Sequence, residues 1–264
     1  MSGVLDHLVI NTKFDTDAVF DIFQALGFTL SPRGYHSLGS INHVIVFPQS
    51  YLELVGLPVG GERLRQEILD SPIGIDGLVM ASDDPEKTRN TLLEKGFDVQ
   101  PVQRFSRLVD LEEGERMASF ATVRLAPNSF AAGRVYFCHH VTPELVWRSA
   151  WMDHANGVEA IVGLTIVSES PSSTRARYAK LGDFDESFQI DIIDASTFHE
   201  RFGSLAIYAG DRREHFAAIT LRTASPSTLR DRASSQGLPH WMDKDGHRLV
   251  IALPQQATLL EILS

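Results

Sequence analysis

One carboxylate stands out because it interrupts an apolar run. Residues 51–56 read Tyr-Leu-Glu-Leu-Val-Gly, a composition typical of a β-strand, with Glu53 at the centre. Side chains alternate along a strand, so Glu53 shares one face with Tyr51 and Val55. This face either meets water or lines a cavity in which a carboxylate binds a cation or moves a proton. The predicted strands and helices around Glu53 indicate which of these two interpretations is correct.

Common catalytic signatures offer no other starting point. The chain has no Gly-x-Ser-x-Gly nucleophile elbow, no glycine-rich phosphate loop and no His-Glu-x-x-His zinc motif. Its single cysteine, Cys138, excludes an intrachain disulfide framework and is typical of a reducing compartment. We therefore expect a cytoplasmic protein.

Composition and charge limit the partners. The chain has 264 residues, of which 43% are hydrophobic and 22% charged, enough for one large domain or two modest domains that share a core. A formal net charge of −10, without a clustered Lys/Arg face, argues against nucleic acid as a partner. No apolar run reaches the roughly 18 residues of a membrane helix. We expect a small-molecule substrate, no nucleic acid and no membrane, and a homodimer is compatible with the sequence.

The elements around Glu53 belong to a repeat. A strand-like segment, residues 4–12, is followed by a helical pattern that ends at Gly27, and the same order recurs from residue 74. Two weaker copies follow, each with Ser-Pro at the helix start and glycine after its end. The predicted helices span residues 14–26, 84–95, 172–181 and 226–236.

Strand-rich sequence follows every predicted helix, so each repeat is a βαβββ module, although the third is short of strands. One module cannot bury both faces of its sheet, and modules must therefore pair. The sequence predicts an α+β fold of four βαβββ modules, paired into two cupped mixed sheets with helices outside. The expected halves are residues 1–146 and 147–264. The predicted strand regions are 42–56, 120–140, 202–210 and 247–264.

The order and spacing of several motifs resemble the vicinal oxygen chelate superfamily, which contains glyoxalase I, extradiol dioxygenases and bleomycin-resistance proteins. The chain looks most like the glyoxalase-like domain branch. The resemblance covers mainly residues 4–158, and the repeat pattern extends over the remainder. The motifs are LDHLVI (5–10), ALGF (25–28), HSLGSIN (36–42), YLELVG (51–56), FCHHVTPELVW (137–147) and HANGV (154–158).

The resemblance implies a metal site, because ligands in this superfamily project inward from the first and last strands of paired modules. His7 and Glu53 hold these positions in the first module. In the second module, Gly77 matches His7 and cannot ligate. His139 and His140 alternate in direction, so only one faces the cup, and His140 matches the family pattern better. The implied ligands of a divalent iron, manganese or zinc ion are His7, Glu53 and His140.

Other polar residues could contact a substrate in the cup. His36, Ser40 and Asn42 lie in or beside a loop that could reach over it, and His139 is a further candidate contact. For the loop residues the alternative role is turn structure. The resemblance implies a metal-dependent lyase, isomerase or dioxygenase acting on a small oxygenated organic molecule. Because Gly77 leaves the glyoxalase I ligand pattern incomplete, the alternative is a metal-free protein that sequesters a small molecule.

The second half has little that could do chemistry. Only Glu261, in a closing strand, echoes Glu53, and the positions that match His7 are Gly163 and approximately Ala218. We expect Glu261 to be a relic or a surface residue. The second half is then expected to support the first structurally.

Overall fold

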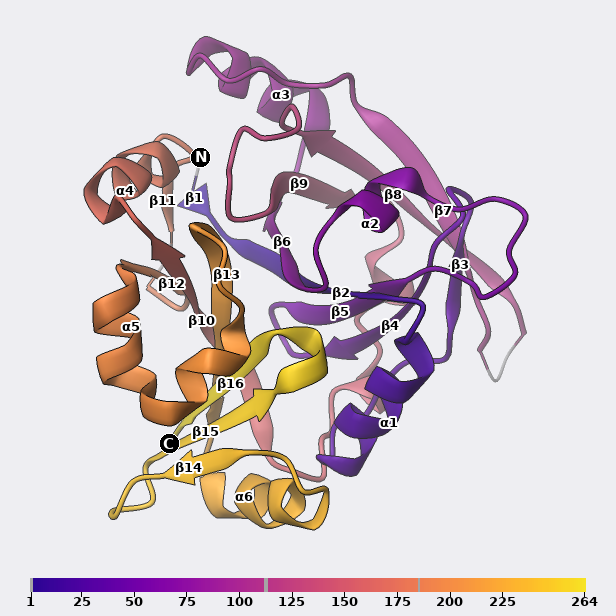
Figure 1. The fold of residues 1–264 in the computed structure, drawn as a ribbon. Coiled ribbons are helices and arrows are strands. Elements are labelled where there is room, and N and C mark those ends of the chain that lie inside the picture. The colour runs from indigo at the N-terminus through magenta and orange to yellow at the C-terminus, as the bar shows by residue number, and fades with distance from the viewer. Residues whose placement is uncertain (1, 112–113, 185) are drawn as a thin grey trace.

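A computed structural model describes residues 2–111, 114–184 and 186–264. Its first half is an eight-stranded closed barrel, in the order β2, β5, β4, β3, β7, β8, β9 and β6 (Figure 1). The barrel therefore contains the two βαβββ modules expected from the sequence. Its strands are β2 (Leu5–Lys13), β3 (Gly34–His36), β4 (Ile41–Val46), β5 (Tyr51–Gly56), β6 (Gly74–Ala81), β7 (Gln103–Val109), β8 (Arg116–Arg124) and β9 (Arg134–His140).

Two contacts between the modules close the barrel. On one side β2 and β6 run antiparallel, and on the other side the short strand β3 pairs with β7. In that second contact His36 lies opposite Arg107, so the two side chains share a face of the sheet. Closure thus brings together polar residues that are far apart in the sequence.

Alternation along the strands decides what the barrel encloses. An apolar cluster of inward residues, including Val9, Val44, Val55, Val79 and Phe120, fills much of the interior. The intervening residues of the same strands, such as Leu8 and Leu54, belong to the main core, which extends to Leu164 and Ile251 of the second half. The two halves therefore share one apolar core.

The second half is an open six-stranded sheet in the order β12, β10, β13, β16, β15 and β14. A two-residue parallel pair, β1 with β11, lies beside it and links the N-terminal segment to the third module. These strands are β1 (Ser2–Gly3), β10 (Val158–Ser168), β11 (Asp183–Phe184), β12 (Gln189–Ile193), β13 (Glu214–Thr223), β14 (His240–Met242), β15 (Arg248–Leu253) and β16 (Thr258–Leu263).

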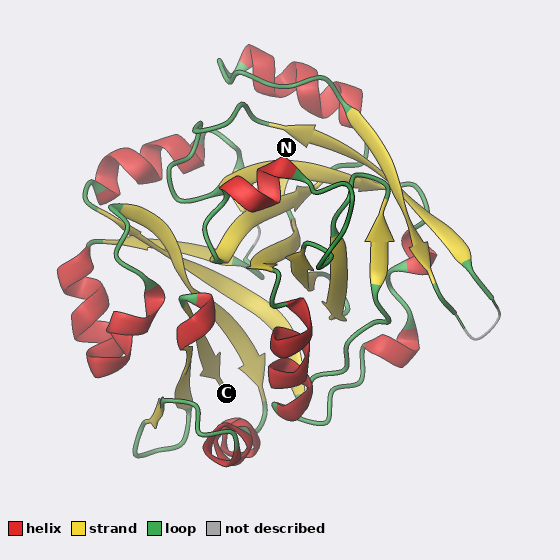
Figure 2. Cartoon of the chain, turned by 45° about the vertical axis from the view of Figure 1, so that its right-hand side comes forward, coloured by secondary structure: helices red, strands yellow, loops and turns green. Residues whose placement is uncertain are grey.

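Helices lie on the outside of both sheets (Figure 2). The four predicted helices are confirmed as α1, α3, α4 and α6, with ends that differ by a few residues. The α-helices are α1 (Thr16–Ala25), α2 (Gln66–Asp70), α3 (Pro85–Glu94), α4 (Pro171–Ala179), α5 (Ala195–Phe202) and α6 (Pro226–Ser235). Short 3-10 helices are η1 (Pro143–Leu145), η2 (Ser149–Trp151), η3 (Gly203–Ala209) and η4 (Pro254–Gln256).

One predicted strand region is wrong. Residues 202–210 form the end of α5 and the 3-10 helix η3 instead of a strand. Phe202, Leu205 and Ala209 are buried at intervals of three and four residues, a helical spacing that buries one side of the segment. The third module therefore replaces its later strands with helices, and it is the incomplete copy of the repeat.

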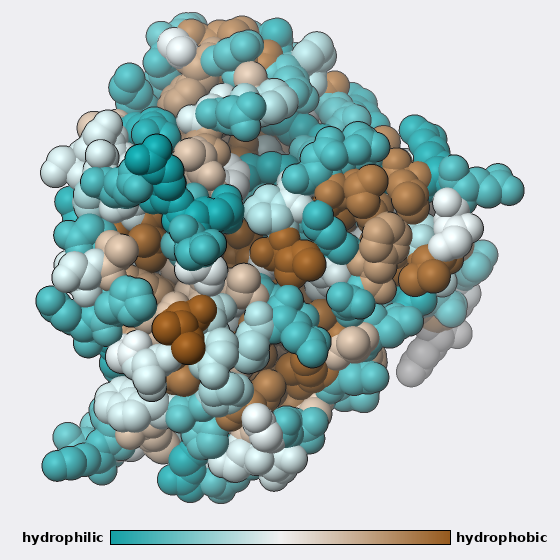
Figure 3. All heavy atoms as spheres, viewed as in Figure 1, coloured by the Kyte–Doolittle hydropathy of each residue, from teal (hydrophilic) through white to brown (hydrophobic). Residues whose placement is uncertain are grey.

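Among the described residues, no helix is both long and apolar enough to cross a bilayer. On the face drawn in Figure 3, hydrophilic residues predominate and hydrophobic residues form separate groups.

Candidate functional site

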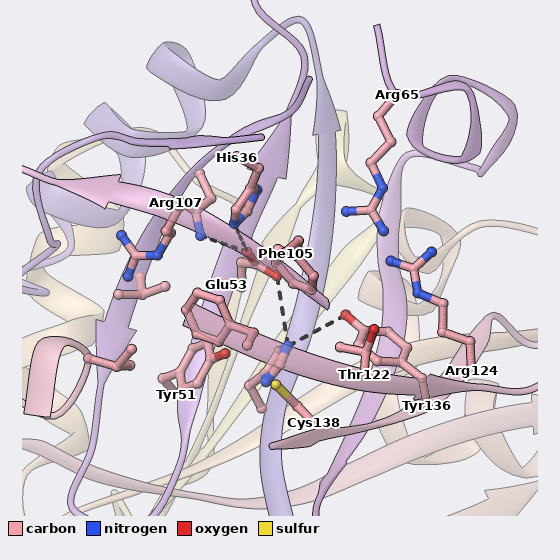
Figure 4. Close-up of a pocket in the computed structure, with 15 residues that line it drawn as sticks. His36, Tyr51, Glu53, Arg65, Phe105, Arg107, Thr122, Arg124, Tyr136 and Cys138 are labelled. Carbon is pink, nitrogen blue, oxygen red and sulfur yellow. Dashed lines mark hydrogen bonds and ion pairs between the residues drawn. The ribbon is translucent and has the colours of Figure 1, made fainter. Parts of the chain in front are cut away.

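A polar cavity lies inside the barrel and is lined by residues of both modules (Figure 4). Glu53 is in its wall, and only 8% of this residue is exposed. Of the two interpretations of the strand YLELVG, the structure supports the cavity, because the face that carries Glu53 is the inside of the barrel. The cavity has about 30 Å³ of free volume, room for one or two water molecules.

Both oxygens of Glu53 face an imidazole nitrogen. Oε2 lies 3.8 Å from Nε2 of His7, and Oε1 lies 3.9 Å from Nε2 of His36. The side-chain amide of Asn42 donates a 2.7 Å hydrogen bond to Oε1. Burial raises the pKa of Glu53, but the two histidines and Asn42 outweigh it, and the pKa is lowered overall. Glu53 is thus a buried carboxylate that stays ionised.

His7 is oriented by its neighbour in sequence. A register shift in the β2–β6 pairing between Leu5 and His7 accompanies the burial of Asp6, whose carboxylate accepts a short hydrogen bond from Nδ1 of His7. A neutral imidazole that donates from Nδ1 has its lone pair on Nε2. Tyr51 stacks on the ring at 4.3 Å between centroids. These contacts aim the Nε2 lone pair of His7 at Glu53.

Asp6 also accepts a hydrogen bond from a second histidine. Nε2 of His140 lies 3.1 Å from the Asp6 carboxylate. Burial of Asp6 raises its pKa, but His140 and His7 outweigh this effect and hold the pKa well below its usual range. Asp6 therefore bridges the imidazoles of His7 and His140 inside the barrel, and of these two rings only that of His7 also faces Glu53.

His36 approaches Glu53 from the opposite side. Its Nδ1 forms a 2.9 Å hydrogen bond with the hydroxyl of Ser40, and its ring edge contacts Phe105. Burial lowers the pKa of His36 to about 4, which makes the ring neutral at pH 7. Of the predicted substrate contacts, His36 and Asn42 therefore reach the cavity directly, and Ser40 reaches it through His36.

His139 and His140 lie on opposite faces of β9, as predicted. His140 points into the barrel and packs against Trp147, with ring centroids 4.7 Å apart, but it does not line the cavity around Glu53. His139 points away, and its Nδ1 bonds the backbone oxygen of Ser82. The structure therefore brings His7 and Glu53 together, separates His140 from them by Asp6, and leaves His139 outside.

A second group of potential ligands surrounds His140. Donor atoms of Asp6, Cys138 and His140 all lie within 4.8 Å of one another. Burial raises the pKa of the Cys138 thiol, whereas a bound metal ion would itself deprotonate a coordinating thiol. Asp6 is already engaged by two imidazoles. Asp6 and His140 are hydrogen-bonded to each other, and together with Cys138 they also offer the donor atoms of a second candidate metal site.

The second module fills the remaining ligand positions with different residues. Strand register places Val9 opposite Glu53 in module one and Val79 opposite Tyr136 in module two, so Tyr136 takes the place of Glu53. Its hydroxyl lies 3.5 Å from Nε2 of His7, and burial raises its pKa, which keeps the phenol neutral. A side chain at Gly77 would begin 2.7 Å from a methyl group of Val9. Tyr136 was not predicted, because the candidate ligands on this strand were its two histidines, His139 and His140.

Three arginines in the cavity wall were also missed. Arg65 and Arg124 both bond Glu67, at 2.6 and 2.9 Å. Arg107 is only 2% exposed. The signal for Arg107 was present in residues 105–109, where an arginine alternates with a phenylalanine and a valine on one face of a strand.

The second half contains an equivalent carboxylate in a different environment. Glu261 lies opposite Thr220 in the parallel β13–β16 pair, as Glu53 lies opposite Val9. It is 1% exposed, so the expectation of a surface residue is wrong. Arg201 and Arg248 donate to its two oxygens at 2.6 and 2.7 Å. Glu261 is fully ion-paired, whereas Glu53 faces two imidazoles across gaps.

Solved structures with the same fold extend the comparison. A hypothetical protein from Staphylococcus aureus matches with a TM-score of 0.63 and 12% identity, over 99% of each chain. A mutant 4-hydroxymandelate synthase from Streptomyces coelicolor matches with a TM-score of 0.58 and 10% identity, over 99% of this chain and 92% of that one. A fusion of a xylose isomerase-like TIM barrel with a 4-hydroxyphenylpyruvate dioxygenase matches at 0.55 and 13%, over 99% and 49%.

At these identities the structural matches establish the fold alone. No curated protein sequence matches the chain. The model of the glyoxalase-like domain family matches residues 5–182, which include the whole barrel and every cavity residue named above. The chain therefore belongs to the glyoxalase-like domain family.

Proposed function

We propose that this protein is a divalent-metal-dependent enzyme that acts on a small oxygenated organic molecule inside the barrel. The proposed ligands are His7, Glu53 and His36. His36 thus replaces His140, the third ligand predicted from the sequence. The observation that carries the proposal is the arrangement of Glu53, whose two oxygens each face an imidazole Nε2 at 3.8 or 3.9 Å.

These distances are too long for hydrogen bonds, which join such atoms at about 2.7–3.2 Å. Each distance taken alone suits two atoms that share an ion, because two ligands that each lie roughly 2.0–2.2 Å from one metal are about 3–4 Å apart. The two imidazoles face different oxygens of Glu53, and the donor atoms of all three residues do not lie within 4.8 Å of one another, so binding one ion requires the side chains to move closer together. A buried carboxylate that faces two ring nitrogens could also be compensated by a cation between them. Two imidazoles and one carboxylate would accept iron, manganese or zinc and leave positions open for a bidentate substrate.

The bound metal would supply Lewis-acid chemistry, polarising a carbonyl or stabilising an enediolate or catecholate. The chain itself supplies the surroundings. Phe105 and Phe120, stacked at 5.3 Å, form an apolar wall, and the neutral phenol of Tyr136 can donate a hydrogen bond to a substrate oxygen. This set of groups suits a lyase, an isomerase or a dioxygenase.

A neighbouring cavity of about 400 Å³ supports an entry route. It shares Arg124 and Tyr136 with the smaller cavity, so these two side chains stand between them. A substrate larger than a few atoms would have to displace one of them to reach Glu53, because the inner cavity has only about 30 Å³ of free volume.

The second candidate function is metal-free binding of a small molecule. It is favoured by the second module, in which Gly77 and Tyr136 replace two ligands of the family pattern. The long contact between the Tyr136 hydroxyl and His7 would then satisfy the imidazole in the absence of an ion.

Metal content separates the two functions. Protein purified without a metal-affinity tag or chelator would be reconstituted with iron, manganese or zinc, dialysed and analysed by mass spectrometry of the metal. We expect about one ion per wild-type chain, and loss of at least 90% of it in Glu53→Gln and in His36→Gln. The exposed Glu94, changed to Gln, is the matched control and should keep the ion. Equal metal content in wild type and Glu53→Gln would reject the proposed site, and no metal in any variant would favour sequestration.

A further inference from the structure

The most unusual charge in the barrel is the guanidinium of Arg107. It is almost completely buried, and its Nη1 has no hydrogen-bond partner. Among residues 2–111, 114–184 and 186–264, no ion pair includes it. An arginine cannot lose its proton to escape burial, so an unpaired buried guanidinium is costly unless a ligand supplies the missing partner.

Neighbouring arginines show that the fold pairs such charges elsewhere. Arg124 and Arg134, also in or near cavity walls, bond Glu67 and Asp76 at 2.9 and 2.7 Å. Among the described residues, no carboxylate forms a hydrogen bond or an ion pair with Arg107. The amide oxygen of Asn42 lies beside the same point above Gly34 as Nη1 of Arg107, and this oxygen is itself unpaired. A neutral amide could accept one hydrogen bond but would not offset the positive charge.

Arg107 is positioned to act together with the proposed metal ligands. It lies opposite His36 across the β3–β7 pair and lines the same cavity as Glu53, although Figure 4 shows its guanidinium pointing away from the Glu53 carboxylate. Glu53 offsets the charge of Arg107, and Glu67 offsets only one of the two charges of Arg65 and Arg124 in the same wall, so a divalent ion would leave an excess of positive charge around the cavity. A neutral substrate would not compensate for these charges, whereas an anionic substrate would.

We propose that Arg107 binds the carboxylate of a small organic acid, with the next oxygen of that molecule directed toward His7, Glu53 and His36. A planar guanidinium pairs with a carboxylate through two parallel hydrogen bonds. The small free volume favours a planar carboxylate over a tetrahedral phosphate. This inference names the substrate class. The direction of the next oxygen rests on the proposed function, whereas binding of the carboxylate to Arg107 needs no metal.

The test uses chelator-treated, full-length protein, so that loss of metal cannot affect the result. Binding of acetate, glycolate, acetamide and inorganic phosphate would be measured by calorimetry and by thermal shift at fixed ionic strength. We expect acetate and glycolate to bind wild type and to bind Arg107→Met at least tenfold more weakly, with partial recovery in Arg107→Lys. Arg104, exposed on the same strand, provides the matched control variant Arg104→Met, which should bind like wild type.

A structural role for Arg107 predicts a different result in the ligand-free protein. If the guanidinium awaits a ligand, Arg107→Met should melt at the same temperature as wild type or higher, because it removes an unpaired buried charge. A clear drop in melting temperature would mean that the fold uses the charge, and it would overturn the proposal. So would equal carboxylate binding by wild type and Arg107→Met, no carboxylate binding by wild type, or Arg107-dependent binding of phosphate alone.

Discussion

Asp6 provides a sharp test of how the candidate site is oriented. Its carboxylate accepts hydrogen bonds from Nδ1 of His7 and Nε2 of His140, and it is 4% exposed. Asp6→Asn keeps the shape and one acceptor oxygen but replaces the other oxygen with an NH2 group. One of the two imidazole N–H groups would then lose its acceptor or face another donor.

The size of the effect follows from these contacts. A hydrogen bond to a charged group contributes about 1.5–3 kcal/mol, so losing one of the two should lower the free energy of unfolding by about 2–3 kcal/mol. The remaining contact would hold His7 less firmly with Nε2 toward Glu53. Loss of such an orienting carboxylate typically lowers metal affinity about 10–100-fold, which corresponds to roughly 1.4–2.7 kcal/mol.

Urea denaturation of metal-free protein at pH 7 would give the stability change, and zinc or manganese titration would give the change in affinity. Asp83 is exposed, and Asp83→Asn is the control, expected within about 0.5 kcal/mol of wild type. Nitrogen NMR of wild-type histidine rings gives an independent readout, with His7 protonated at Nδ1. The reasoning is refuted if Asp6→Asn matches the control in both stability and metal affinity, or if His7 carries its proton at Nε2 alone.

Three further outcomes follow from the same geometry. Cys138→Ser should change metal affinity less than about twofold, because Cys138 is not one of the proposed ligands. A tenfold loss in metal titration would place the ion at Cys138 instead. Glu261→Gln should lower the free energy of unfolding in urea by about 2–3 kcal/mol, since it leaves two partly exposed arginines without their shared partner, while metal retention by the folded protein stays unchanged. Burial lowers the pKa of His36 to about 4, so as the pH drops the imidazole is protonated in the unfolded chain before it is protonated in the folded protein. The free energy of unfolding should therefore fall between about pH 6.5 and pH 4, by up to about 3 kcal/mol from this residue. In His36→Gln the fall measured by urea denaturation at pH 7, 5.5 and 4 should be smaller by that amount; an identical slope would contradict the assigned burial.

Much of the fold could be predicted because each repeat of the module carries short-range sequence patterns that indicate its helix and strands. Strand alternation, helical spacing and glycine after each helix recur with the modules, and the four helices they indicate are confirmed. The strand predicted for residues 202–210 was wrong because a short apolar run is compatible with a strand or a helix equally well. Its helical spacing becomes clear only when residues from Phe198 to Ala209 are considered together.

The candidate site was less accessible from the sequence because it depends on contacts between distant segments. The inward direction of Glu53 follows from strand alternation once a barrel is assumed. The approach of His36 to Glu53 depends on the pairing of β3 with β7, a two-residue contact that no local pattern specifies. The role of Asp6 depends on a strand irregularity beside His7. That of Arg107 depends on its having no ion pair with any of the described residues, although the charge of Glu53 acts on it from within the same cavity.

The most direct test of the central claim is to locate the metal ion itself. Crystals of the wild-type protein, reconstituted with zinc, would be measured on both sides of the zinc absorption edge. We predict one anomalous peak inside the barrel, about 2.0–2.2 Å from Nε2 of His7, Nε2 of His36 and an oxygen of Glu53. A peak bound by Asp6, Cys138 and His140, or no peak near Glu53 in zinc-saturated crystals, would contradict the account.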